Sequence, residues 1–480
     1  MRKAFLISVL TASFCAATCT VCCLARAESG HQRRSAQKYI KVRVKSKPTD
    51  RDWKLRDTRT IELLEGFKDG SKQIQRSKYG GRADTKAQAK GFFYPKKIAD
   101  RWWLVDPDGN LFIHVALCSV NRGRSKISQR PAIEKFGTPR KWADFSTGLL
   151  AMYAFNGTGG WSDTDLLRAT SHPPVYTLSW NFMGSFGRSK DLVWQEPGHL
   201  AYPNKCIPVF HPDFEKSCDD YARQLAPMRD DPWLLGHFSD NELPIVQDML
   251  DRSLQLDVND PDLRSGYEAA KKWLSSRKGR QAAPHDITDA DRQAFLAYVF
   301  DRYCRITTNA IRKYDSNHLC LGPRLHGRAL ALPAIFRAAG KHLDVVSVNC
   351  YGAWGPDPAK MTMWSHESGR PFMITEFYAK GQDSGLPNNT GAGWLVPTQS
   401  DRGRFYQHFT LGLLESQSCV GWHWFKYRDN NPEDLSTDPS NRDSNRGIVN
   451  YKYEPYSALL GQMRQLNNQV YALIDYFDYN

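Results

Sequence analysis

The sequence predicts an α/β fold: a (β/α)8 TIM barrel preceded by a short N-terminal extension that contains β-structure. Its 480 residues, 41% of them hydrophobic and 12% aromatic, are enough to build one large core. From Gly91 onward, short apolar runs alternate with helix-like stretches, which is the pattern of βα units around a parallel sheet. No internal repeat is apparent, and this disfavours a propeller or a solenoid.

Eight apolar runs have the character of barrel strands. The first follows the Asp-Pro-Asp-Gly sequence at 106–109, which is strong turn chemistry. The connection after the fourth run, residues 243–290, is the longest and is charged and partly helical. The eight proposed strands are Leu111–Val120, Leu150–Asn156, Val175–Trp180, Trp233–Asp240, Leu319–Arg324, Leu343–Cys350, Pro371–Phe377 and Val420–Phe425.

The N-terminus has the pattern of a signal peptide. Arg2 and Lys3 give a positive start, an apolar run follows, and Ala25-Arg26-Ala27 supplies a cleavage signal. We therefore expect export to the periplasm, the cell surface or the medium, with cleavage near Ala27. The apolar run is short for a membrane span and no later stretch approaches that length, so no membrane span is expected.

The remaining chain divides by composition. Residues 28–85 are polar and basic, and are expected to be a leader or a packing extension, while residues 86–480 form the barrel domain. The net charge of +14 comes largely from this leader. A basic exported protein can bind anionic polysaccharides, so the charge leaves an anionic substrate as an alternative. For the basic segment itself, a solvated leader is favoured over a nucleic-acid interface.

Two carboxylates stand at the ends of apolar strands. Asn241-Glu242 closes the proposed fourth strand in LLGHFSDNE, and Glu376 closes the seventh in PFMITEF. Active-site residues of such barrels lie at the carboxyl ends of the strands. Retaining glycosidases need two carboxyls about 5–5.5 Å apart, one to protonate the leaving oxygen and one to attack the anomeric carbon. The barrel can bring these two together, where burial is expected to give them distinct pKa values.

Longer motifs point to a family. RWWLVDPDGNLF, FNGTGGWSD, LLGHFSDNE, TEFYAKGQDSGLPNNTGAGW and GWHWFKYRDN resemble the agarase-like members of glycoside hydrolase clan A, close to family 50. The resemblance implies that Glu242 is the acid/base, that Glu376 is the nucleophile, and that Asn241 binds the hydroxyl beside the scissile bond. It implies a retaining hydrolase of β-linked galactan of the agar or porphyran type, whose chemistry requires no metal and no cofactor.

Other strand ends supply candidates for substrate binding. In the clan that the chain resembles, the residue after strand six hydrogen-bonds the nucleophile and an aromatic of strand eight floors the sugar that is attacked. These positions hold Tyr351 and the pair Trp422 and Trp424, whose period-two spacing places both on one side of the strand. The remaining candidates follow strands two and five or lie in the TGAGW loop: Asn156, Trp161, Arg324, His326 and Trp394.

Several other chemistries are disfavoured. The histidines are too dispersed for a metal motif, and a G-x-S-x-G elbow does not occur. TGAGW lacks the Lys-Ser/Thr of a phosphate-binding loop. Among the seven cysteines after residue 27, the pair Cys206 and Cys218 remains a candidate disulfide. Two alternatives remain: a hydrolase of another β-glycan or β-galactoside on the same barrel, and a non-catalytic carbohydrate-binding barrel.

Overall fold

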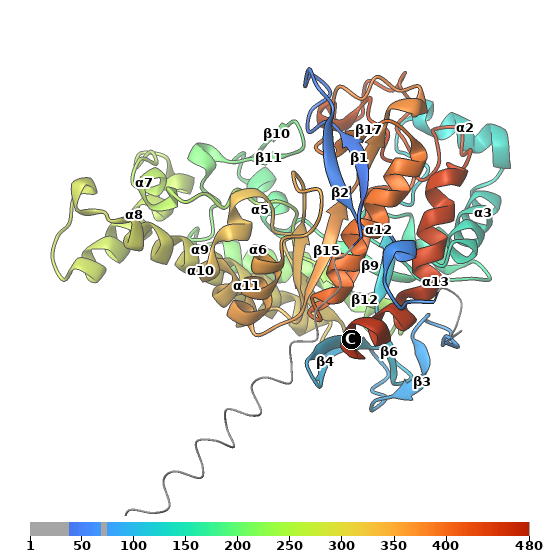
Figure 1. Ribbon diagram of the computed structural model, residues 1–480. Helices are drawn as coiled ribbons and strands as arrows, with labels where there is room; N and C mark the ends of the chain where they lie inside the picture. The colour runs from blue at the N-terminus through green and yellow to red at the C-terminus, as the bar shows by residue number, and fades with distance from the viewer. Residues whose placement is uncertain (1–37, 69–73, 480) are drawn as a thin grey trace, which may run out of the picture.

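The computed structural model describes residues 38–68 and 74–479, and its centre is an eight-stranded parallel barrel (Figure 1). A parallel bridge between Leu325 and Val348 joins the two ends of the strand order. The predicted TIM barrel is therefore confirmed. In chain order its strands are β7 (His114–Leu117), β8 (Gly157–Thr158), β9 (Val175–Ser179), β12 (Leu234–Phe238), β13 (Leu319–Gly322), β14 (Val346–Asn349), β15 (Phe372–Phe377) and β18 (Cys419–Trp424).

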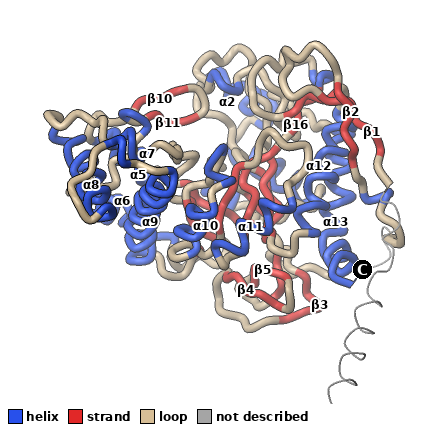
Figure 2. The backbone as a smooth tube through the Cα atoms, turned by 60° about the vertical axis from the view of Figure 1, so that its left-hand side comes forward, coloured by secondary structure: helices blue, strands red, loops and turns tan. Residues whose placement is uncertain are grey.

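Helices surround the barrel and cover the outer face of its strands (Figure 2). α7, α8 and the start of α9 form the long insertion after the fourth barrel strand and project to one side (Figure 1). The helices are α2 (Lys126–Phe136), α3 (Pro139–Met152), α4 (Thr164–Arg168), α5 (Phe182–Ser189), α6 (Phe214–Ala222), α7 (Met249–Ser253), α8 (Pro261–Lys278), α9 (Asp289–Tyr314), α10 (Pro333–Gly340), α11 (Pro358–Ser368), α12 (Gln399–Glu415) and α13 (Ser457–Tyr479).

The second predicted strand is misplaced. Leu150 and Met152 belong to α3, which begins at Pro139 after the capping side chain of Thr138. Leu149 and Leu150 are buried on the inner face of this helix, and so short an apolar run does not distinguish a buried helix from a strand. The strand itself, β8, starts only at Gly157.

The first predicted strand is two strands in the structure. β6 (Asn110–Phe112) joins β3 (Arg82–Lys86), β5 (Arg101–Val105) and β4 (Tyr94–Ile98) in a four-stranded antiparallel sheet. The chain then continues into β7 of the barrel. Leu104 and Phe112 of this sheet share an apolar cluster with Val175 and Leu235 of the barrel strands, so the sheet closes the end at which those strands begin.

The basic N-terminal segment also contains ordered structure. β1 (Ile40–Val44) and β2 (Lys54–Thr58) form an antiparallel hairpin. Lys45 then exchanges backbone hydrogen bonds of 2.9 Å with Leu395 of β17 (Trp394–Val396), which pairs with β16 (Ala379–Gly381). The predicted signal peptide lies outside the described residues.

Two further sequence expectations concern cysteines and membranes. All seven cysteines in the described part of the chain are free, so the pairing of Cys206 with Cys218 is wrong. Over residues 38–68 and 74–479, no helix combines the length and the apolar character that crossing a bilayer requires.

Candidate active site

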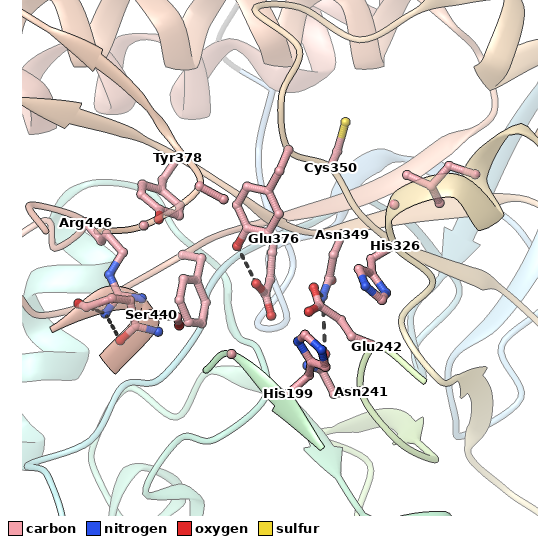
Figure 3. A pocket seen from close by; sticks show the side chains of 18 of the residues that line it. His199, Asn241, Glu242, His326, Asn349, Cys350, Glu376, Tyr378, Ser440 and Arg446 are labelled. Carbon is pink, nitrogen blue, oxygen red and sulfur yellow. Dashed lines mark hydrogen bonds between the residues drawn. The ribbon is translucent and has the colours of Figure 1, made fainter. Parts of the chain in front are cut away.

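A cavity of about 630 Å3 opens at the carboxyl ends of the barrel strands. Glu242 and Glu376 both line it, and Figure 3 shows their side chains pointing into the same space. Their approach follows from the fold, because the carboxyl ends of all eight parallel strands meet at one end of the barrel.

Glu376 lies on β15 and is 5% exposed. Arg324 places its Nη2 2.9 Å from Oε1, and the Tyr351 hydroxyl donates to Oε2. Burial raises the pKa of Glu376, the Arg324 charge opposes this shift, and the negative charge of Glu242 adds to it. The carboxylate therefore has a donor on each oxygen.

Glu242 follows β12 by four residues, in a loop rather than in the strand. Asp240 fixes the start of this loop by accepting hydrogen bonds from the backbone N–H of Met183 and from the Tyr303 hydroxyl. Asn349 Nδ2 donates to Glu242 Oε1 at 2.8 Å. Burial raises the pKa of Glu242, and the Asn349 hydrogen bond only partly opposes it.

The hydrogen-bond partners of the two carboxyls differ in charge and number. Glu376 receives a guanidinium and a hydroxyl, whereas Glu242 receives one neutral amide. Charge-assisted hydrogen bonds are about twice as strong as neutral ones. The donors on Glu376 therefore favour its ionised form more than the single amide favours that of Glu242, while burial raises the pKa of both carboxyls.

Backbone strain gathers at this end of the barrel. Ser119, Trp161, Glu242 and Arg324 have φ of 55°, 62°, 52° and 51°, in the left-handed region that side chains other than glycine rarely adopt. They come from the loops after four different barrel strands, and three of them line the cavity. Such conformations concentrate at functional sites, where the surrounding structure holds them.

Arg324 has a different position from the one expected of a substrate-binding residue. Its side chain is fully buried, and its guanidinium lies 4.3 Å from the centre of the Trp161 ring. Nη2 also donates to the Thr375 carbonyl at 2.8 Å, so the group is held from two sides. Arg324 thus contacts Glu376 directly and favours its ionised form, while Trp161 both packs on Arg324 and lines the cavity.

The structure brings several other predicted residues to the cavity. Asn241, Tyr351 and His326 line it together with both glutamates. Asn241 Oδ1 accepts a hydrogen bond of 3.2 Å from Asn349 Nδ2, which places both asparagines beside the acid/base candidate.

Three predicted tryptophans do not line the cavity. Trp422 and Trp424 do share one side of β18, but it is the outer side, where their Nε1 groups donate to the Tyr406 hydroxyl and the Arg446 carbonyl. Period-two spacing puts both rings on one side of the strand but does not tell which side faces the barrel interior. Trp394 packs against Trp354 instead of facing substrate.

Asn156 is also a structural residue. It precedes β8, and its side chain accepts from Val115 N–H and donates to the Ile113 carbonyl, each at 2.8 Å. Because the strand starts one residue later than this asparagine, Asn156 lies at the wrong end of β8 for catalysis.

The sequence did not point to several other residues that line the cavity, among them His199, Asn349, Tyr378, Phe425 and Arg446. Asn349 ends β14, and Phe425 directly follows β18, so a stricter use of strand ends could have found both. His199 and Arg446 come from irregular connections, where no periodic pattern marks a residue.

Among the described residues, His237, Asp315 and His318 form one group with the spacing of metal ligands. Both imidazoles contact the Asp315 carboxylate, at 2.8 and 2.7 Å. The second ring nitrogen of His237 accepts from Trp180, and that of His318 lies 2.8 Å from the Asp231 carbonyl. Each ring nitrogen already has a partner, so these residues act as a buried hydrogen-bond network away from the catalytic cavity.

Comparisons with known proteins fit this geometry. No protein-family model matches the chain. The chain is 23% identical over 501 residues to beta-agarase B of Vibrio sp. (strain JT0107), with 85% of this chain covered, and it spans about half (51%) of that relative's length. The structure described as that of an exo-beta-agarase is 19% identical with a TM-score of 0.69, covering 84% of this chain and 68% of that one, and it supports the fold alone.

A nearer structural relative decides the family. The crystal structure of BpGH50 is 32% identical, with a TM-score of 0.80, and the match covers 93% of this chain and 98% of that one. Identity at this level over nearly the whole of both chains, together with paired glutamates at the ends of strands four and seven, shows that the chain belongs to glycoside hydrolase family 50.

Proposed function

We propose that the protein is a retaining glycoside hydrolase that cleaves β-linked galactan of the agar or porphyran type. The observation that carries the proposal is the pair of carboxyls in one cavity, with a guanidinium and a hydroxyl on Glu376 and a single amide on Glu242. This asymmetry supplies an ionised nucleophile and a protonated acid in the same site.

In the first step, a Glu376 carboxylate oxygen attacks the anomeric carbon. The bond from that carbon to the glycosidic oxygen breaks, and the leaving oxygen takes the proton from Glu242. Burial suits Glu242 to this role, because it raises the pKa of the carboxyl and so favours its protonated form. The product of the step is a covalent glycosyl-enzyme and a shortened glycan.

In the second step, Glu242 acts as a base. It removes a proton from water, whose oxygen attacks the anomeric carbon and displaces Glu376 as a carboxylate. Arg324 and Tyr351 stabilise the charge that returns to Glu376. Both displacements invert the anomeric carbon, so the released sugar retains its configuration.

The substrate is proposed from relatives. The Vibrio relative is named a beta-agarase and a structural neighbour an exo-beta-agarase. The alternatives are another β-glycan and binding without cleavage. Comparing activity on sulfated porphyran with activity on neutral agarose shows whether the enzyme prefers an anionic or a neutral galactan. Activity on mannan and on mixed-linkage glucan tests the other β-glycans.

The test uses the full chain and these polysaccharides. We expect wild type to cleave agarose or porphyran, and NMR of the first-formed product to show retention. Glu376→Gln should be inactive, whereas Glu62→Gln, an exposed glutamate outside the cavity, should behave as wild type. An inverted first product would exclude the nucleophile role, and cleavage of mannan or glucan alone would exclude the galactan.

Glu242→Gly gives an independent test of the acid/base. Glycine fits the φ of 52° at this position without strain. On an activated aryl glycoside the variant should still form the glycosyl-enzyme, and added azide should restore turnover by replacing water. A glycosyl azide of retained configuration supports the role, and failure of azide to restore turnover contradicts it.

We also propose that the protein is exported after cleavage near Ala27. The N-terminal pattern of charge, apolar run and Ala25-Arg26-Ala27 supports this proposal. N-terminal sequencing of the protein recovered from the periplasm or medium should begin at Glu28. Recovery of an uncleaved chain in the cytoplasm alone would contradict it.

A further inference from the structure

A second cavity, of about 920 Å3, continues from the first. The two share three lining residues: His199, Glu242 and His326. Glu376 lines only the first cavity. Figure 3 places His199 and His326 beside Glu242, on the side of Glu376 that lies away from Arg446.

Glu242 lies between the two cavities, and this position indicates which part of the substrate the second cavity would hold. The nucleophile contacts the sugar that is attacked, and the acid/base contacts the oxygen that bridges it to the leaving group. A path from Glu376 past Glu242 therefore leads to the leaving group. On the basis of the proposed function, we propose that the second cavity binds the leaving-group oligosaccharide and that Trp194 is its outer stacking platform.

The walls of this cavity suit a sugar chain. Pro244, Ile245 and Val246, which begin two residues after Glu242, give an apolar surface, and Asn204 and Lys205 add polar groups. Trp194 lines the cavity and is 49% exposed. An exposed indole presents a flat apolar face to the C–H face of a pyranose, while its N–H remains free to reach a hydroxyl.

Trp194 lies on a hairpin whose position is fixed by hydrogen bonds to another loop. It belongs to the hairpin of β10 (Trp194–Glu196) and β11 (His199–Ala201), seen at the upper left of Figure 2. The turn is Pro197-Gly198, and the φ of 93° at Gly198 suits the glycine position of a type II turn. Gly198 N–H donates to both Asp438 carboxylate oxygens at 3.1 Å, which ties the hairpin to the loop after β18. The platform is thus held in place before substrate binds, which lowers the entropy cost of binding.

The experiment measures kcat and KM on agarose oligosaccharides of increasing length. Trp194→Ala should raise KM for the longer substrates about twofold to tenfold, the loss of one aromatic contact, with kcat unchanged. The shortest cleaved oligosaccharide, whose leaving group stops short of the hairpin, should be unaffected. Trp194→Phe should restore most of the affinity, because the ring remains.

The control is Tyr298→Ala, an aromatic of α9 with a similar exposed fraction of 42% that lies outside both cavities. An unchanged KM at every length, or an equal loss at every length including the shortest, would overturn the role of Trp194. A wild-type protein that cleaves no galactan would overturn the proposed function and this inference together. Wild-type cleavage with a Trp194 variant of normal KM would overturn the inference alone.

Discussion

Replacing Arg324 by methionine tests the electrostatics of the site directly. The substitution removes the cation whose Nη2 lies 2.9 Å from Glu376 Oε1 and keeps much of the side-chain volume. Among the described residues, the Tyr351 hydroxyl is then the side-chain donor that remains on the carboxylate. In the proposed mechanism Glu376 attacks only when it is ionised, so activity falls as the pH drops below the pKa of Glu376. Because loss of a positive charge raises that pKa, the acidic limb of the pH profile must move to higher pH.

The size of the shift follows from the geometry. Two unit charges at 2.9 Å interact by about 6 kcal/mol at an effective dielectric constant of about 20. At about 1.4 kcal/mol per pH unit this caps the shift at about four units. An opposite charge in such contact typically changes a carboxyl pKa by about one to three units, which is the shift we expect. On the acidic limb each unit lowers the ionised fraction tenfold, so kcat/KM there should fall about tenfold to 1,000-fold.

The assay is kcat/KM against pH for wild type, Arg324→Met and Arg324→Lys. Lysine keeps the charge but loses the planar fork that also reaches the Thr375 carbonyl. Its acidic limb should therefore stay near that of wild type, although kcat falls. Thermal unfolding of each variant controls for folding. If Arg324→Met is folded and weak but its acidic limb does not move, the guanidinium does not set the charge of Glu376.

Two further predictions concern the same barrel. Tyr351→Phe removes the hydroxyl that donates to Glu376 Oε2, and a hydrogen bond to a charged group contributes about 1.5–3 kcal/mol, so kcat/KM should fall about tenfold to 150-fold. Its acidic limb should also move to higher pH, and an unmoved limb would contradict the contact. Gly157→Ala would place a Cβ 1.9 Å from His114 Nε2 and should lower the free energy of unfolding by at least about 1–3 kcal/mol. Gly148→Ala is the matched control, because a Cβ there meets nothing within 4 Å and alanine favours the helix; equal melting temperatures for the two variants would contradict the overlap.

The sequence by itself determined the barrel and the identity of its two carboxyls. Apolar runs and turns predict the positions of the strands. Because the carboxyl ends of parallel barrel strands lie at the same end of the barrel, residues that follow different strands are predicted to lie close together. Glu242 and Glu376 could therefore be placed in one cavity although 133 residues separate them along the chain, and the strand-five and strand-six positions led to Arg324 and Tyr351.

Only the tertiary structure decided which way side chains point and what the connections contribute. Trp422 and Trp424 face outward, where they donate to the Tyr406 hydroxyl and the Arg446 carbonyl, and their period-two spacing fixes that they share a side but not which side faces the interior. Phe425 lines the cavity in their place. Arg324 was expected to contact substrate, but its guanidinium reaches from the loop after β13 to Glu376 on β15, and only the folded structure shows this contact. The hairpin that carries Trp194 and His199 is placed by a hydrogen bond from Gly198 to Asp438, 240 residues away, and no local pattern encodes such a contact.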